Sequence, residues 1–406
     1  MRTVAALAAC AFALAACGEK DEETTAASSD EWADESITIG SVYSETGIGK
    51  PFGPQQVQGA ELAVDEINAA GGVEGAELEL VQLDDRSDPR VSARATRALI
   101  EQEDALALLG PTFSNSAAEA HPVANNLGAP MLATSNTAPG IVGDCAYPCE
   151  LIFRDSLGEA EAIPANVESY AAENPDAKTA TVIYPKDDPF GETTAKIAAD
   201  ALEAEGIDAG KVELPTPLRG LVLVDAVDRG DVPGAIFNRT DAIFVTASSG
   251  EVAAQVIRLA RRSGFDGDIL GGNAFNSAAA AAAAGPDGEG ARSAAAWFAG
   301  SDAPENVAFI EAYEEAYGEP PDQFAAQAYT GIQLLAEAAR NSDLSFDDLA
   351  ADRLALAEAL SAVGIPTPLG LFSFTSDNDV SQPIWIVEMD GRGGFELIEE
   401  AAAPGS

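Results

Sequence analysis

Small hydroxyl and amide side chains follow the apolar, strand-like segments of this chain at several points. The apolar residues 131–133 run into Thr134, Ser135, Asn136 and Thr137, and an earlier apolar segment runs into "GPTFSNS", which contains Ser114. Such side chains, together with helix N-termini, can hold a small polar ligand through hydrogen bonds. The alternative is that Ser114, its neighbour and Asn136 only cap helices or turns.

Similar chemistry recurs in the second half of the chain. The segments "KDDPFG", "ASSG" and "GGNAFN" each follow an apolar segment, and they contain Phe190, Ser249 and Asn273. Open α/β sheets bind ligands beyond the carboxyl ends of their strands. The repetition in both halves therefore predicts a cleft between two lobes, with the rings of Phe52 and Phe190 supplying apolar surface.

The motifs of several enzyme classes are absent. "GIGK" (residues 47–50) fails as a phosphate-binding loop, because Ser44 stands where the first glycine is needed and Pro51 replaces the Ser/Thr. No G-x-G-x-x-G opens a helix, and no G-x-S-x-G is present. His121 is the only histidine, so a nucleophile would have a single possible imidazole base. We expect no catalytic residues and no cofactor, and a hydrolase remains a weak alternative.

Charge and cysteine content narrow the possible partners. The formal net charge of −45 argues against binding of nucleic acid, because phosphate groups require a basic protein surface. The acidity fits either adaptation to high salt or a plain solvated surface. Cys145 and Cys149 lie in "GDCAYPCE", which predicts a disulfide outside the cytoplasm. The alternative, a zinc site, lacks its second pair of ligands, so we expect no metal.

The N-terminus has the features of an export signal. An apolar run of residues 4–16 follows Arg2 and is too short to span a bilayer as a helix. It ends in Leu-Ala-Ala-Cys, which resembles a bacterial lipobox and predicts removal of residues 1–16 and lipidation of Cys17. An ordinary secretory signal is the alternative. Residues 17–35 are acidic and aperiodic, which is typical of a disordered tether.

Apolar strand-like and amphipathic helix-like segments alternate from residue 37 onward. One β-α-β-α series ends at about residue 154 and a second series follows it, so parallel sheets with helices on both faces are predicted for each. Three further helical stretches and two apolar strands complete the chain. A length of 406 residues fits two lobes rather than one core.

Taken together, the chain resembles the type I periplasmic solute-binding proteins of branched-chain (hydrophobic) amino-acid ABC importers. The resemblance covers nearly all of residues 36–399. It is carried by "TGIGKPFGPQQVQGAELAVDEINAAGGVEG", "LDDRSDP", "LLGPTFSNSAAEAHPVANNLGAPMLATSNTAP", "YPKDDPFGE" and "IRLARRSGF".

The resemblance implies two Rossmann-like lobes, joined by a three-stranded hinge, that close on a ligand. Residues 36–154 with 300–371 would form the first lobe, and residues 155–299 with 372–400 the second. The crossings would fall near Arg154, Ala299 and Phe372. A membrane permease would recognise the closed form and an ATPase would drive import.

The resemblance also implies roles for individual residues. Ser114 and nearby amides would hold a ligand carboxylate, and Ser135 and Thr137 would contact the carboxylate and the α-amino group, with Asn136 between them. Phe52 and Phe190 would form aromatic walls and Phe324 would close the side-chain pocket. Ser249 and Asn273 would face them from the second lobe.

Two positions depart from the family pattern. Asn273 stands where the family has an acidic residue for the ligand ammonium, and Ser249 where an aromatic is common. Losing a charge-assisted hydrogen bond of about 1.5–3 kcal/mol would weaken an α-amino acid roughly ten- to a hundredfold. We therefore expect a ligand without an ammonium group, such as an amide, a urea-like compound or a short carboxylate. If the alignment slips, Asp266 or Asp268 would supply the acid.

The function predicted from these observations is that of an extracytoplasmic, lipid-anchored and monomeric receptor for a small polar solute. It would serve the permease and ATPase subunits of an ABC importer. A sensor that presents its closed form to a signalling partner is the main alternative.

Overall fold

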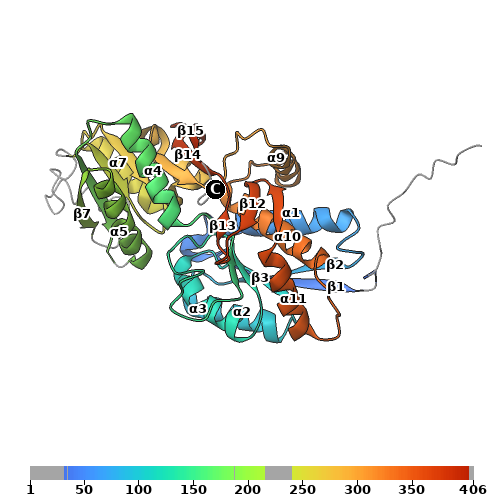
Figure 1. The fold of residues 1–406 in the computed structure, drawn as a ribbon. Coiled ribbons are helices and arrows are strands. Elements are labelled where there is room, and N and C mark those ends of the chain that lie inside the picture. The colour runs from blue at the N-terminus through green and yellow to red at the C-terminus, as the bar shows by residue number, and fades with distance from the viewer. Residues whose placement is uncertain (1–31, 34, 187, 215–239, 402–406) are drawn as a thin grey trace, which may run out of the picture.

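The computed structural model describes residues 32–33, 35–186, 188–214 and 240–401. They form two α/β lobes that lie side by side (Figure 1). The predicted signal peptide, Cys17 and most of the predicted tether lie outside these residues. Within them, no helix has the length and apolar character needed to cross a membrane.

The first lobe contains a five-stranded parallel sheet in the order β2-β1-β3-β4-β5. Its strands are β1 (Ser36–Tyr43), β2 (Glu77–Asp84), β3 (Ala107–Leu109), β4 (Met131–Ala133) and β5 (Ile152–Arg154). Its first three helices are α1 (Gly53–Ala69), α2 (Pro89–Glu101) and α3 (Ser114–Asn126), and η1 (Gly47–Gly49) is a short 3₁₀ turn.

Both faces of this sheet are covered, which explains why β3 and β4 are apolar at every position. Leu109 and Leu132 pack with α1 and the C-terminal helices, whereas Leu108 and Met131 pack with α2 and α3. Adjacent strand residues point to opposite faces, so a strand buried on both sides reads as a continuous apolar run.

The second lobe contains a seven-stranded sheet in the order β15-β14-β10-β9-β8-β6-β7. Its strands are β6 (Thr179–Pro185), β7 (Asp208–Leu214), β8 (Ala242–Val245), β9 (Asp268–Gly271), β10 (Arg292–Ala295), β14 (Ile384–Met389) and β15 (Phe395–Ala401). Its helices are α4 (Glu159–Glu173), α5 (Pro189–Ala204), α7 (Gly250–Arg262) and α8 (Ala278–Ala284), with 3₁₀ turns η3 (Asn273–Asn276) and η4 (Gly285–Gly288).

The fold class predicted from the sequence, two lobes with parallel sheets, is confirmed. The second sheet is nevertheless mixed, because β14 and β15 add to its edge as antiparallel strands. The parallel strands run from β6 to β10, with α4 and α5 on one face and α7 and α8 on the other.

The C-terminal helices return to the first lobe. They are α9 (Pro304–Tyr317), α10 (Gln323–Arg340) and α11 (Leu349–Ser361). Helix α10 packs along α1, and Gly59 permits the close approach, because a Cβ there would lie 2.2 Å from the carbonyl oxygen of Ala325. A small antiparallel sheet follows, made of β11 (Gly364–Thr367), β12 (Gly370–Phe374) and β13 (Val380–Ser381).

The chain crosses between the lobes three times: after β5, after β10 and between β13 and β14. The third crossing differs from the expected division at residue 372. Phe372 is fully buried in the core of the first lobe, and the chain joins the second sheet only at Ile384, the first residue of β14. The apolar residues of β12 pack in the small sheet with β11 and β13, so their pattern does not show where the chain crosses to the second lobe.

The predicted disulfide is present. Cys145 and Cys149 are bonded, with their Cα atoms 6.4 Å apart, in the loop between β4 and β5. In the described part of the chain, no three His, Cys, Asp or Glu side chains are grouped as a metal site would need.

Candidate functional site

A pocket with about 590 Å³ of space, counting its opening to solvent, lies between the lobes. It sits at the carboxyl ends of the parallel strands, where α/β sheets bind ligands. From the first lobe it is lined by Ile48, Phe52, Thr112, Phe113, Ser114, Asn115, Ser135, Thr137 and Phe324. From the second lobe it is lined by Asp188, Pro189, Phe190, Ala247, Ser248, Asn273 and Ala274.

The N-terminus of α3 is the anion-seeking part of the pocket. Its N-cap residue, Phe113, offers no side-chain hydrogen bond to the first turn. Ser114 and Asn115, the first residues of the helix, line the pocket. The positive end of the helix dipole favours an anion at this position. The Ser114 hydroxyl accepts a hydrogen bond of 3.3 Å from the amide of Ala138 and so joins α3 to the loop after β4.

The loop after β4 turns two of its residues toward the pocket and one away. The Ser135 hydroxyl donates to the carbonyl of Thr112 (2.8 Å) and accepts from the Gln56 amide (2.9 Å). Thr137 is buried, and among the described residues its hydroxyl has no hydrogen-bond partner. Asn136 does not line the pocket, because its side-chain amide donates to the carbonyl of Pro111 (2.7 Å). Thr137 is therefore accessible to a ligand, whereas Asn136 stabilises the conformation of the loop.

Aromatic rings form the apolar wall. Phe52, Phe113 and Phe324 pack as one buried cluster, with the rings of Phe52 and Phe324 4.7 Å apart. Phe190 faces the same pocket from the start of α5. Ile48 is exposed at the rim, with 62% of its surface accessible. This wall suits a ligand with an apolar portion of moderate size.

Asp188 supplies negative charge from the second lobe. It is the N-cap of α5, and one carboxylate oxygen accepts from the amide of Gly191 (3.1 Å). The other oxygen accepts from the Ser248 amide (2.8 Å) and hydroxyl (3.0 Å). Asp188 was not among the binding residues predicted from the sequence, where it is one of 67 acidic residues. Its signal was the Asp-Pro pair at a helix start, directly after a strand.

Ser249, which the sequence placed in the site, is instead the N-cap residue of α7, and its neighbour Ser248 lines the pocket. A shift of one residue in an extended segment turns the side chain to the other face. Asp266 and Asp268, the alternative acids, line a separate acidic hollow at the opposite end of the strands.

Asn273 lines the pocket and is held by two residues. Its side-chain oxygen accepts from the Gln323 amide of the first lobe (2.7 Å), and its backbone amide donates to Glu159 (2.9 Å). Glu159 is fully buried, and its second carboxylate oxygen has no partner among the described residues. Burial raises the pKa of Glu159 to about 7, against the lowering effects of the Asn273 amide and of the Arg154 charge.

The only histidine lies away from this pocket. His121 is fully buried in α3, and its ring nitrogen is 3.4 Å from the carbonyl of Gly110. Burial lowers the pKa of His121 to about 4, so the ring is neutral near pH 7. No imidazole therefore stands beside the pocket hydroxyls as a base in the described structure.

The structure thus brings together seven of the nine predicted binding residues: Phe52, Ser114, Ser135, Thr137, Phe190, Asn273 and Phe324. Asn136 and Ser249 lie beside the pocket without lining it. Five further residues in or beside the pocket were not predicted from the sequence: Asp188, Ser248, Phe113, Thr112 and Glu159. Of these, Asp188 alters the chemistry most.

Known proteins match this chain over most of its length. The family model described as periplasmic binding protein matches residues 36–394. The leucine-, isoleucine-, valine-, threonine- and alanine-binding protein of Pseudomonas aeruginosa is 26% identical over 86% of this chain and 88% of its own length. A chemotactic signal transduction system substrate-binding protein of Halobacterium salinarum is 28% identical over 64% of this chain and 61% of its own length.

Solved structures share the fold. The branched-chain amino acid transporter substrate-binding protein LivJ of Streptococcus pneumoniae, in complex with isoleucine, superposes with a TM-score of 0.75 at 24% identity. It covers 91% of this chain and 100% of its own. An ABC transporter solute-binding protein of R. palustris in complex with benzoate has a TM-score of 0.77 at 23% identity, over 91% of this chain and 98% of its own.

Proposed function

Because this chain belongs to the periplasmic binding protein family, we propose that it is the solute receptor of an ABC importer and that it binds an α-amino acid with an apolar side chain. The resemblance seen in the sequence agrees with the family match. The curated relative and the two solved structures named above are binding proteins rather than enzymes.

The observation that carries the proposal is the opposition of charges across the pocket. The N-terminus of α3, with Ser114 and Thr137, favours a carboxylate on the first lobe. Asp188 favours a cation on the second lobe. The phenylalanine cluster of the first lobe (Phe52, Phe113 and Phe324) would cover an apolar side chain. A zwitterion with an apolar side chain satisfies all three surfaces at once.

Asp188 changes the expectation drawn from Asn273. The side-chain oxygen of Asn273 accepts a hydrogen bond from Gln323, so it is already engaged in a contact between the lobes. The ammonium of a ligand then has Asp188 as its acceptor. A neutral amide, a urea-like compound or a carboxylate without an ammonium would leave this carboxylate desolvated without a cation, which is unfavourable.

Ligand capture would proceed by closure of the two lobes over the pocket. Both lobes contribute polar side chains to the pocket, so a bound ligand would stabilise the closed arrangement more than the open one. The closed receptor would then present a joined surface to the permease, and the ATPase subunits would supply the energy for import.

The same proposal includes anchoring outside the cytoplasm. Lipidation of Cys17 after removal of residues 1–16 would hold a monomeric receptor at the membrane, with about 0.8 kcal/mol for each buried CH₂ of the acyl chains. The disulfide between Cys145 and Cys149 supports an oxidising compartment.

A thermal-shift screen tests the ligand class. Hydrophobic α-amino acids, their carboxamides and their des-amino acids are compared at equal concentration. An amino acid at 100 times its Kd should add about 2.7 kcal/mol to the free energy of unfolding, and the two analogues should add less. The double variant Ser114→Ala, Thr137→Ala should lose the shift. Retention of binding by this variant would refute the assignment of the pocket.

A second candidate function is chemotactic sensing, which the Halobacterium salinarum relative favours. The receptor would bind the same ligand but present its closed form to a signalling protein. Cells lacking the receptor distinguish the two: loss of labelled amino-acid uptake supports import, whereas intact uptake with loss of the swimming response supports sensing.

A further inference from the structure

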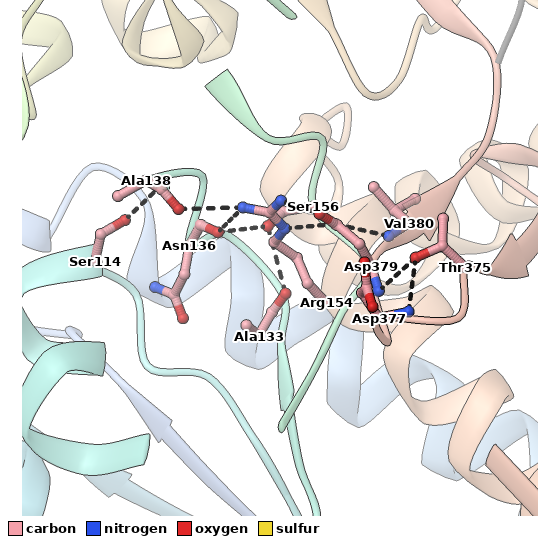
Figure 2. Close-up of polar contacts among 10 residues, drawn as sticks. All are labelled: Ser114, Ala133, Asn136, Ala138, Arg154, Ser156, Thr375, Asp377, Asp379 and Val380. Carbon is pink, nitrogen blue, oxygen red and sulfur yellow. Dashed lines mark hydrogen bonds and ion pairs between the residues drawn. The ribbon is translucent and has the colours of Figure 1, made fainter. Parts of the chain in front are cut away.

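Arg154 occupies a central position at the first crossing between the lobes. It is the last residue of β5 and is only 4% exposed, although it carries a full charge. Its Nε atom donates to one carboxylate oxygen of Asp379 (2.7 Å), and its Nη2 atom bonds the other oxygen. A two-point guanidinium–carboxylate pair of this kind fixes orientation as well as charge. Figure 2 shows the pair between the loop after β4 and the turn before β13.

The third guanidinium nitrogen reaches the ligand-binding loop. Nη1 of Arg154 donates to the carbonyl oxygens of Asn136 (3.4 Å) and Ala138 (3.2 Å) (Figure 2). These two carbonyls flank Thr137, whose side chain lines the pocket. The amide of Ala138 in turn donates to the Ser114 hydroxyl at the start of α3 (3.3 Å). The buried side chain of Arg154 thus holds the carbonyls on both sides of Thr137 in the loop after β4, without lining the pocket itself.

Asp379 is itself held in a tight turn. Its backbone amide donates to the Thr375 hydroxyl (3.2 Å), and its carboxylate accepts from the amide of Val380 (2.7 Å). The neighbouring carbonyl of Asn378 accepts from the backbone amide of Arg154 (3.0 Å). The turn is therefore bonded to β5 through both backbone and side-chain atoms, and these bonds fix the position of the Arg154 guanidinium.

A second acid lies near the same guanidinium but is not paired with it among the described residues. Glu161, on α4 of the second lobe, has a buried carboxylate oxygen with no partner among the described residues. A Cβ placed on Gly158 would lie 2.4 Å from that oxygen and 2.6 Å from Nη2 of Arg154, so both atoms flank the same glycine. Without Asp379, Arg154 would turn to Glu161 and leave the two loop carbonyls.

From these contacts we propose that Arg154 is a positioning residue of the pocket. Anchored by Asp379, it holds the carbonyls of Asn136 and Ala138 and so keeps Thr137 and the Ser114 hydroxyl directed at the ligand carboxylate. The inference rests on the proposed function, because it concerns affinity for the carboxylate of an amino acid.

The test compares an amino acid with its carboxamide. The amino acid giving the largest thermal shift and its carboxamide are titrated calorimetrically into the wild type and into Asp379→Asn. The variant should lose about tenfold in affinity for the amino acid and less than threefold for the carboxamide. Arg154→Lys, which keeps the charge without the planar fork, should show the same selective loss.

Two further variants sharpen the result. Removing the competing acid in Asp379→Asn, Glu161→Gln should restore part of the lost affinity. Glu173→Gln is the matched control, because it removes the acid partner of Arg292, another buried arginine (3.1 Å), in the second lobe away from the pocket. It should leave both affinities unchanged. Urea unfolding of each variant shows that it is folded.

Three outcomes would overturn the inference: an unchanged amino-acid affinity in Asp379→Asn, an equal loss for both ligands, or the same selective loss in the Glu173→Gln control. If the wild type binds no amino acid, the proposed function itself is refuted, and the inference falls with it. A selective effect on the amino acid is not expected from a general weakening of the fold.

Discussion

The two walls of the pocket are built differently. On the first lobe, buried polar side chains are bonded to one another: Gln56 accepts from the Thr112 hydroxyl (2.7 Å), and it donates to Ser135 (2.9 Å). Thr112 also accepts from the amide of Ser44 (2.8 Å). On the second lobe, the polar wall consists of Asp188 with its partner Ser248, and of Asn273.

This difference indicates a division of labour. A buried polar network that is fully bonded is rigid, so the first lobe presents a pocket half that is ordered before the ligand arrives. The second lobe adds a single charged group at the end of a helix. We therefore expect the first lobe to set how the ligand is oriented and the second lobe to set whether its ammonium is recognised.

The largest expected effect comes from Asp188→Asn. The substitution keeps the size of the side chain but removes its charge, so affinity for an α-amino acid should fall about ten- to a hundredfold. Affinity for the des-amino acid should be nearly unchanged. Calorimetric titration of both ligands checks this, and an equal loss for both would remove the distinction between the two walls.

A pH effect of comparable size is expected from Glu159 beneath the second-lobe wall. Burial raises its pKa in the folded protein from 4.5 to about 7, so between these values the folded state holds more protons than the unfolded state. The free energy of unfolding should therefore be highest below pH 4.5 with respect to this group. It should fall by on the order of 3 kcal/mol as the pH rises to about 7.

The variant Glu159→Gln isolates that contribution. Urea unfolding from pH 4.5 to 7 should show a shallower fall in the variant than in the wild type. Asp322 remains in both proteins, and burial raises its pKa to about 7 as well, so a residual slope in the same direction is expected. Identical slopes in the two proteins would contradict the assignment to Glu159.

The first-lobe network is tested by Gln56→Leu. The substitution leaves the buried hydroxyls of Thr112 and Ser135 short of a partner, and it should lower the free energy of unfolding by about 1–3 kcal/mol. Ligand affinity should fall for the amino acid and its des-amino analogue alike, in contrast to Asp188→Asn. A ligand-selective loss would mean that the network does not orient the whole ligand.

The smallest effect is expected from the disulfide. A ring closed by Cys145 and Cys149 is short, so its removal by Cys→Ser at both positions should cost at most about 2 kcal/mol of unfolding free energy. The loop does not line the pocket, and ligand affinity should be unchanged. A clear loss of affinity would contradict this and would mean that the disulfide loop also helps to order the first-lobe side of the pocket.

The sequence predicted the α/β lobes because their strands and helices have strong periodic patterns. It did not predict β7, β11, β13 or β15. Strand β7 has few buried positions, and β15 is an edge strand with acidic residues along it. Partly exposed edge strands lack the apolar signal of central ones, so they are found through their neighbours rather than their own residues.

Local residue types pointed to seven of the residues that line the pocket but could not give the orientation of neighbouring side chains. Asn136 and Thr137 are adjacent and equally polar, yet one holds the loop and the other faces the pocket. Which of them does which depends on Pro111 and Arg154, distant in the sequence and brought close by the sheet. The assignment of Ser249 missed by one residue for the same reason.

The packing of α10 against α1 has a consequence for how the chain is made. About 270 residues separate Gly53 from Gln323, and the parallel strands β6 to β10 of the second lobe are synthesised between them. The first lobe therefore cannot complete its core until strands β6 to β10 of the second lobe have been synthesised, and the slow, long-range contacts come last. Such an order of events delays stable folding of the first lobe until most of the chain has been synthesised.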